Sequence, residues 1–171
     1  MGATSDIERL RLAVEDAIAK TLEALELDVS VTALDGPQSG QEVSVDPIYV
    51  LMPIGFRTSE VTLFLHASPR DCERLMHCVG GDSAGAYTYN DGDLRGGLAG
   101  LASMMAELME SVLGRNDISL GSPRVPEDPR ALDRARHDCG GSIMLRASFG
   151  ASEVYCDLLL DTIADDRKLA A

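Results

Sequence analysis

The sequence contains no tryptophan, and aromatic residues make up only 4% of it. Aliphatic side chains and methionine must therefore fill any hydrophobic core. Basic residues are scarce too: 15 Lys and Arg stand against 28 Asp and Glu, which gives a formal net charge of −13 and a pI of about 4.5. No cluster of lysines and arginines occurs, so the charge argues against nucleic acid and against anionic membrane surfaces as partners.

Long apolar runs are missing as well. None approaches the roughly 18 residues that a membrane-spanning helix needs, and the first residues lack the basic and apolar regions of a secretory signal. The four cysteines are scattered along the chain, which is typical of free thiols in a reducing compartment. We therefore expect a cytoplasmic location. Neither a phosphate-binding loop with its lysine nor a Gly-x-Ser-x-Gly turn is present.

Hydrophobic residues nevertheless make up 45% of the 171 residues, which is enough to bury a core. The length predicts one domain over residues 1–171, with its core at about 7–161 and a tail at 162–171. Apolar periodicity and turn residues predict the following elements: helices at 5–27, 69–79 and 93–113; strands at 29–34, 48–56, 61–66 and 118–125; a hairpin at 141–161; one or two helical turns within 126–138; and polar loops at 35–41 and 82–92. This order predicts an α+β fold, in which hairpins build a mainly antiparallel sheet and long helices pack on one face.

The predicted helix at 93–113 has two distinct sides at about 100° per residue. One broad arc is apolar and should face the core; it contains Leu98, Leu101, Met105, Leu108, Met109 and Val112. We assign Met104 to the core as well. The opposite side, which we call the outer stripe, consists of Gly96, Gly100, Ser103, Glu107, Glu110 and Gly114.

The outer stripe is unusual for a solvated helix surface. A glycine inside a helix costs about 0.5–1 kcal/mol relative to alanine, and two glutamates one turn apart repel each other mildly. One interpretation is that the glycines allow close packing inside this protein while the glutamates are solvated. The other is that the glycines form a flat platform for a second surface, from which Glu107 and Glu110 project.

The pattern continues beyond the helix. The segment Glu107-Leu-Met-Glu110-Ser-Val-Leu-Gly114 is followed at 118–125 by Ile-Ser-Leu-Gly-Ser-Pro-Arg-Val. This motif, together with the order of elements from about Ile7 to Asp161, resembles the CheX/CheC group of chemotaxis phosphatases. The first helix contains no Glu-x-x-Asn, so the resemblance is to the single-motif CheX branch rather than to the two-motif CheC branch.

The resemblance implies an auxiliary protein that docks on a phosphorylated CheY-type response regulator and promotes hydrolysis of its aspartyl phosphate. In that family a glutamate anchors the helix to a basic group of the regulator, and this role falls on Glu107. An asparagine one turn later orients the attacking water, and Glu110 occupies its position here. The rest of the outer stripe would contact the partner. No cofactor of its own is implied, because the regulator supplies Mg²⁺, and a homodimer formed through a sheet edge is compatible with the family.

Glu110 leaves alternatives open. An ionised carboxylate accepts hydrogen bonds but donates none, and it repels a phosphoryl group and the carboxylates of a regulator. Glu110 could act as a base, could be held protonated, or could mark a protein that binds without hydrolysis. The last case describes a non-catalytic response-regulator-binding or flagellar-switch-like interaction module on the same fold. A further interpretation is a structural domain whose glycine face packs against a second copy.

A metal site is the remaining alternative. His77-Cys78 and His137-x-Cys139 could converge on zinc, but neither pair has the spacing of a zinc finger, so we interpret them as ordinary imidazoles and thiols and predict no metal site. His66 has no such neighbour in the sequence. The fragment Asp91-Gly-Asp93 lacks the other ligands of a calcium loop, and we interpret it as a turn with a helix N-cap.

Overall fold

The computed structural model describes residues 3–34, 47–56, 59–80, 88–128 and 130–160. The predicted loop at 35–41, the tail at 162–171 and most of the loop at 82–92 lie outside these ranges. Within them the helices are α1 (Ala3–Glu23), α2 (Pro69–Gly80), α3 (Asp91–Leu113) and α4 (Ala131–Asp138). The strands are β1 (Val29–Leu34), β2 (Ile48–Phe56), β3 (Ser59–Ala67), β4 (Ile118–Leu120), β5 (Gly141–Phe149) and β6 (Ser152–Leu160).

These strands form one sheet in the order β1-β5-β6-β3-β2-β4, and each neighbouring pair is antiparallel. Two hairpins supply its centre, β2 with β3 and β5 with β6. The second hairpin turns at Gly150, whose φ of 59° suits a residue without a Cβ atom. The predicted hairpins and the predicted antiparallel α+β class are confirmed.

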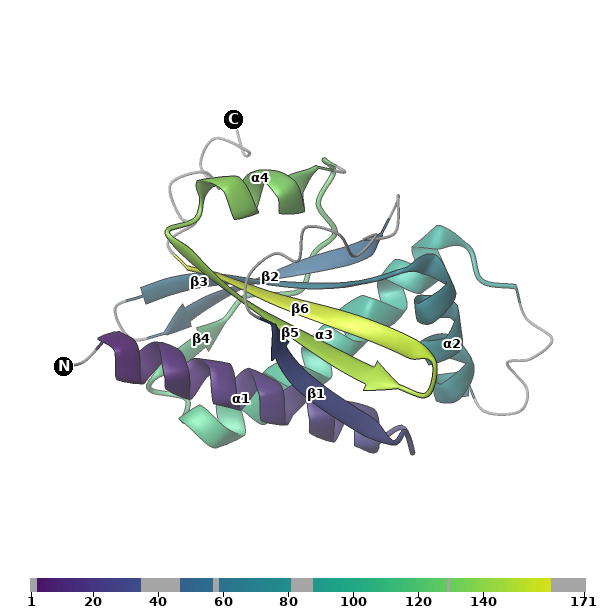
Figure 1. Ribbon diagram of the computed structural model, residues 1–171, viewed down its shortest axis with the longest axis horizontal. Helices are drawn as coiled ribbons and strands as arrows, with labels where there is room; N and C mark the ends of the chain where they lie inside the picture. The colour runs from purple at the N-terminus through teal and green to yellow at the C-terminus, as the bar shows by residue number, and fades with distance from the viewer. Residues whose placement is uncertain (1–2, 35–46, 57–58, 81–87, 129, 161–171) are drawn as a thin grey trace.

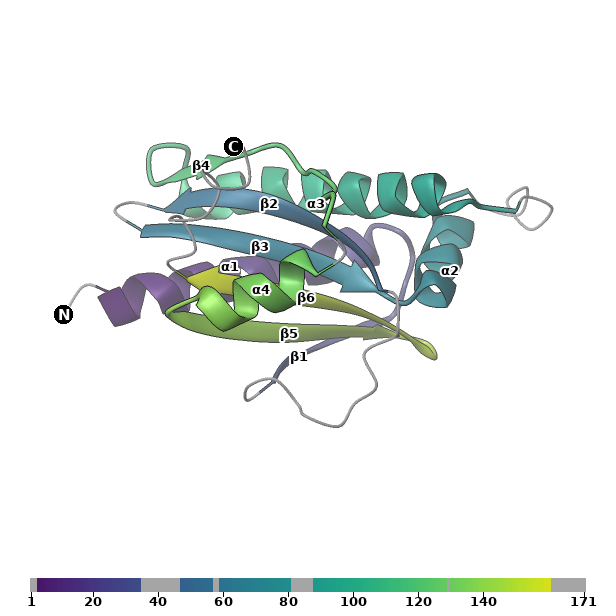
Figure 2. The same cartoon turned by 90° about the horizontal axis from the view of Figure 1, so that it is seen from above.

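The two long helices, α1 and α3, cover one face of this sheet, as the sequence predicts (Figures 1 and 2). Helix α1 turns a continuous apolar row inward, because Leu10, Val14, Ile18 and Leu22 recur every four residues and are at most 1% exposed. Arg9 lies 3.8 Å from an Asp117 carboxylate oxygen, which places the start of α1 beside the end of α3. Helix α2 packs against α3 and against β6 at the end of the sheet.

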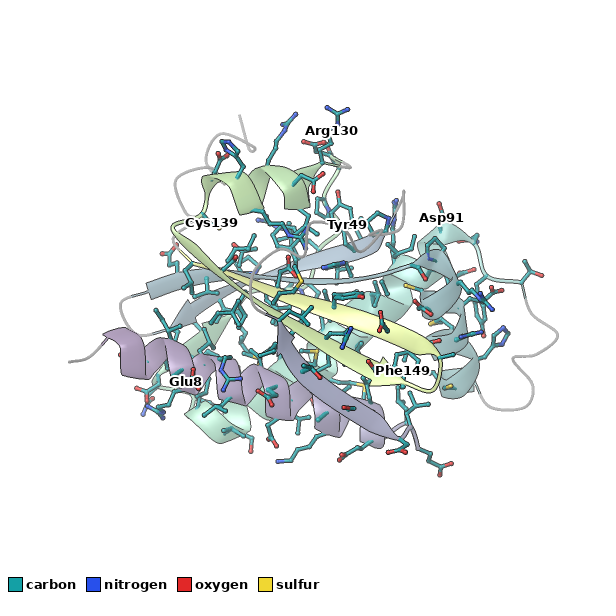
Figure 3. All side chains as sticks on the ribbon, viewed as in Figure 1. Glu8, Tyr49, Asp91, Arg130, Cys139 and Phe149 are labelled. Atoms are coloured by element: carbon teal, nitrogen blue, oxygen red, sulfur yellow. The ribbon has the colours of Figure 1, made fainter. Side chains whose placement is uncertain are left out.

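The short helix α4 lies on the opposite face of the sheet (Figure 3). In that view Arg130 and Cys139 mark its two ends, and Tyr49 lies on the sheet below it. A second, smaller hydrophobic cluster joins the helix to this face; its buried members are Tyr49, Phe64, Leu132 and Leu159. The charged connection at 126–138 therefore contains a helix of eight residues, in line with the predicted one or two turns.

Two elements, α1 and β4, differ most in extent from their predicted ranges. Helix α1 ends at Glu23, and the chain turns through Glu26, with φ of 62°, before β1 begins. The strand predicted at 118–125 ends at Leu120, and pairing returns only at an isolated bridge from Arg124 to Leu51. Pro53 of β2 explains this break. Its carbonyl accepts a hydrogen bond from the Gly121 N–H at 2.8 Å, but proline has no N–H to donate a second hydrogen bond to this segment.

All four cysteines are free thiols. Cys72 on α2 and Cys156 on β6 are buried in the main core. Burial raises the pKa of the Cys72 thiol to about 12, and burial also raises the pKa of the Cys156 thiol. Cys78 is exposed, and Cys139 is partly exposed. No helix of the described residues is long and apolar enough to cross a membrane.

These environments predict the order of thiol modification. Because the thiolate is the reactive form, iodoacetamide at pH 8 should label Cys78 first and Cys139 more slowly. Cys72 and Cys156 should react only after unfolding, since a raised pKa keeps both thiols protonated at this pH and the core covers them. Peptide mass spectrometry with and without urea measures the order. Rapid labelling of Cys72 in the folded protein would contradict the packing of α2.

Candidate functional site

Helix α3, which carries the predicted site, is fixed at its start by a reciprocal cap. The Asn90 side chain accepts a hydrogen bond from the Asp93 backbone N–H at 2.9 Å. The Asp93 carboxylate accepts one from the Asn90 backbone N–H at 3.0 Å. This capping box begins the helix at Asp91, so the N-cap is Asn90, one residue before the predicted Asp91-Gly-Asp93 turn. Figure 3 shows Asp91 at this end of the helix.

The outer stripe of α3 faces solvent. Five of its six residues are exposed, and Glu110 is partly exposed. A Cβ atom built on Gly96, Gly100 or Gly114 would meet no atom within 4 Å, so packing inside the protein does not require these three glycines. The interpretation that they serve internal close packing is therefore wrong. Gly97 differs, since a Cβ atom there would lie 2.1 Å from the sulfur of Met76 on α2.

The polar groups of the stripe are available to a second molecule. Glu107 is exposed, and no hydrogen bond or ion pair holds its carboxylate in the described part of the chain. Oε2 of Glu110 lies 3.7 Å from Nε of Arg115. The Ser103 hydroxyl donates to the Ala99 carbonyl at 3.0 Å, which leaves its oxygen free to accept a bond. Two carboxylates one turn apart thus project from a flat surface, as the sequence predicts.

Two apolar residues assigned to the core are instead exposed. Met104 is 40% exposed and Val112 is 53% exposed. The buried arc is narrower than the wheel indicates, and Met105 and Met109 form part of it at 0% exposure. Met104 follows Ser103 and adjoins the outer stripe, while Val112 lies in the last helical turn. The prediction that both belong to the core is wrong.

The histidines lie on separate elements. His66 is buried on β3, His77 on α2 contacts the ring of Tyr89 edge-on at 5.2 Å, and His137 on α4 is exposed. Among the residues that the structure describes, no group of three or more His, Cys, Asp or Glu side chains could hold a metal ion. The pairs considered as zinc ligands, His77-Cys78 and His137-x-Cys139, are therefore not part of such a group.

Sequence reasoning missed a buried polar network under α4. Asp157 on β6 and His66 on β3 each have side chains only 2% exposed, and Nε2 of His66 lies 3.2 Å from Oδ1 of Asp157. Nε and Nη2 of Arg136, from α4, both lie 2.6 Å from Oδ2 of Asp157. The His66 ring stacks on Tyr155 at 5.3 Å. One signal was visible in the sequence, since Asp157 interrupts the apolar strand SEVYCDLLLD.

Tyr155 extends this polar region along β6. Burial raises the pKa of its phenol to about 12, and the hydrogen bond to Glu153 adds to the shift. The phenol therefore stays neutral at physiological pH and donates to Oε2 of Glu153 at 2.6 Å. Arg146 on β5 lies 3.8 Å from the other Glu153 oxygen. The Glu153 carboxylate thus has two partners, Tyr155 and Arg146, whereas the Glu107 carboxylate on α3 has none among the residues that the structure describes.

Comparison with known proteins gives similarity in structure only. No protein-family model matches the chain, and no curated protein sequence matches it. A CheC-like protein from Shewanella oneidensis MR-1 superposes with a TM-score of 0.58 and 10% identity, over 91% of this chain and 97% of that chain. A chain of the CheX–CheY–BeF3–Mg²⁺ complex from Borrelia burgdorferi gives a TM-score of 0.58 at 10% identity, with coverages of 91% and 97%. FliY from Thermotoga maritima gives a TM-score of 0.57 at 12% identity, with coverages of 99% and 96%.

These matches span nearly the whole of each compared chain. The chain therefore has the fold of the CheX/CheC-like proteins, and the predicted resemblance is confirmed at the level of the fold. The identities of 10–12% show the fold alone, and the fold does not distinguish a phosphatase from an interaction module. The distinction rests on the side chains of the outer stripe.

Proposed function

We propose that this protein docks on a phosphorylated CheY-type response regulator through the outer stripe of α3 and promotes hydrolysis of its aspartyl phosphate. The observation that carries the proposal is the unobstructed Glu107-x-x-Glu110-x-x-x-Gly114 motif on a helix of a CheX/CheC-like fold. One of the similar structures is a CheX–CheY complex, which supports a CheY-type partner for this protein. Chemotaxis or a related two-component pathway is the corresponding context.

The geometry of the stripe suits this partner. Three glycines without obstruction allow a second backbone to approach closely, and Glu107 projects from that platform to meet a basic group. Hydrolysis of an acyl phosphate needs an in-line water and stabilisation of charge on the phosphoryl oxygens. We expect the regulator to provide Mg²⁺ and most of that stabilisation. The contribution of this protein is then to place a polar group beside the water.

A second candidate is a regulator-binding module without phosphatase activity. The carboxylate of Glu110 favours it, because it cannot donate a hydrogen bond while ionised and would face an anionic phosphoryl group. Both candidates use the same surface and the same anchor, Glu107. They differ only in whether docking accelerates the loss of phosphate.

The decisive experiment follows the decay of a CheY-type regulator from the same genome, phosphorylated with acetyl phosphate, with and without this protein. We expect faster decay, and we expect Glu107→Ala to weaken binding about 30-fold, because losing one member of a buried charge pair costs about 2 kcal/mol or more. Calorimetry with the BeF3⁻-activated regulator measures binding separately from hydrolysis.

The matched control is Glu23→Ala, which removes an exposed carboxylate from α1 and should change neither quantity. Binding without faster decay would select the non-catalytic module. Absence of binding to any phosphorylated regulator of that genome would contradict both candidates.

A further inference from the structure

Arg115 is held beside Glu110 by the cap of α3. Gly114 adopts φ of 87° and ψ of 137°, which only glycine adopts readily. Its N–H donates to the Glu110 carbonyl at 3.0 Å, and its own carbonyl accepts from the Asp117 N–H at 3.0 Å. Ile118 then enters the sheet opposite Phe56. The turn is therefore fixed at both ends, and it brings the Arg115 guanidinium back to the last turn of the helix.

The pair that results is open to a partner. The Arg115 side chain is 88% exposed and the Glu110 side chain is 37% exposed. In the described part of the chain Arg115 forms no other ion pair. An ion pair with this much exposure contributes little to folding, so stability does not account for its position. A surface that docks on the outer stripe would cover it and remove the water around it.

The two side chains are chemically complementary. A neutral amide accepts a hydrogen bond through its oxygen and donates through its nitrogen, whereas an ionised carboxylate only accepts and a guanidinium only donates. Together, Glu110 and Arg115 offer both functions at one place. The guanidinium also offsets the repulsion between Glu110 and an anionic phosphoryl group. We propose that Glu110 and Arg115 act jointly in place of a single asparagine, with Glu110 positioning the attacking water and Arg115 binding the phosphoryl group.

This inference rests on the proposed function and assigns a chemical step to each side chain. The Glu110 carboxylate accepts a hydrogen bond from the attacking water, and Arg115 donates to a phosphoryl oxygen of the regulator. The water oxygen forms the new bond to phosphorus, and the bond from phosphorus to the aspartyl oxygen breaks with its electron pair left on the aspartate. One water proton passes to Glu110 and then to solvent, and the other remains on the released hydrogen phosphate.

The test measures the dephosphorylation rate of the phosphorylated regulator at saturating concentrations of single and double variants of this protein. Arg115→Ala should lower the maximal rate of dephosphorylation by about 10-fold or more, in the range of a positioned polar group. Its Kd for the BeF3⁻-activated regulator should rise by a smaller factor than the maximal rate falls, since Glu107 remains the anchor. Arg115→Lys should recover part of the rate. In a Glu110→Asn background the amide supplies both functions, so Arg115→Ala should then have little effect.

Arg9→Ala is the matched control, because Arg9 forms a similarly long pair with Asp117 at 3.8 Å, with side chains 44% and 37% exposed, outside the outer stripe. It should leave the rate unchanged. If the wild-type protein does not accelerate decay, the proposed phosphatase function is wrong, and this inference is overturned with it. If the wild type accelerates decay and Arg115→Ala does not slow it, this inference alone is overturned. Equal effects of Arg115→Ala in the wild-type and Glu110→Asn backgrounds would also overturn the joint role.

Discussion

Exchanging Arg136 for methionine is expected to lower the free energy of unfolding by about 3 to 5 kcal/mol. Arg136 is the group that compensates the carboxylate of Asp157, which is 2% exposed. Methionine keeps much of the length and apolar contact of the side chain, so the variant removes mainly the charge. The remaining partner, His66, offers a single bond of 3.2 Å. A buried carboxylate without its cation costs more than the gain from most single contacts in a core.

Urea unfolding followed by circular dichroism measures the loss, as a lower midpoint at an unchanged slope. Arg134→Met is the matched control on the same helix. Arg134 pairs with Asp128 at 2.9 Å but is 66% exposed, so its loss should cost less than about 1 kcal/mol. Asp157→Asn added to Arg136→Met should restore part of the stability, because a neutral amide removes the buried charge. A loss below about 1 kcal/mol for Arg136→Met alone would show that water or His66 compensates Asp157.

The network under α4 also shows where sequence reasoning ends. Periodicity predicted α1 because its apolar residues recur within one helix, and apolar segments joined by turn residues predicted the two hairpins because their strands are adjacent in sequence. Arg136 and Asp157 are 21 positions apart, and no local pattern joins them. The sequence predicted one or two helical turns in the charged segment 126–138 but not where they pack; Leu132 is 5% exposed, on the opposite face of the sheet from the long helices.

The sequence predicted which helix face carries the candidate site, but it did not predict the burial of the residues around that face. A helical wheel gives the direction of a side chain but not how far neighbouring elements extend, which explains the wrong assignment of Met104 and Val112. The wheel placed Glu107 and Glu110 on one open side, where the structure has them. It gave no reason to include Arg115, which lies outside the helix and reaches Glu110 only because Gly114 reverses the chain.

Gly100→Leu is expected to separate the stability of α3 from its use as a docking surface. The site of its Cβ atom is empty, so leucine should raise the free energy of unfolding by about 0.5–1 kcal/mol through its higher helix propensity. For a chain of this length that corresponds to a rise in Tm of roughly 1–4 °C. Gly97→Leu should instead lower the free energy of unfolding, because the Met76 side chain occupies the space beside Gly97.

Docking should respond in the opposite direction to stability. A leucine in the middle of the outer stripe holds a partner backbone away from Glu107, so we expect Gly100→Leu to weaken binding of the BeF3⁻-activated regulator at least about 10-fold, a cost of roughly 1.4 kcal/mol. Glu23→Leu, on the exposed side of α1, is the control and should bind normally. Size-exclusion chromatography tests the alternative that the glycine face packs against a second copy. An oligomer that is lost in Gly100→Leu would mean that a second copy covers the outer stripe. A stabilised variant that binds the regulator as tightly as the wild type would remove the outer stripe from the interface, since no close approach could then be required there.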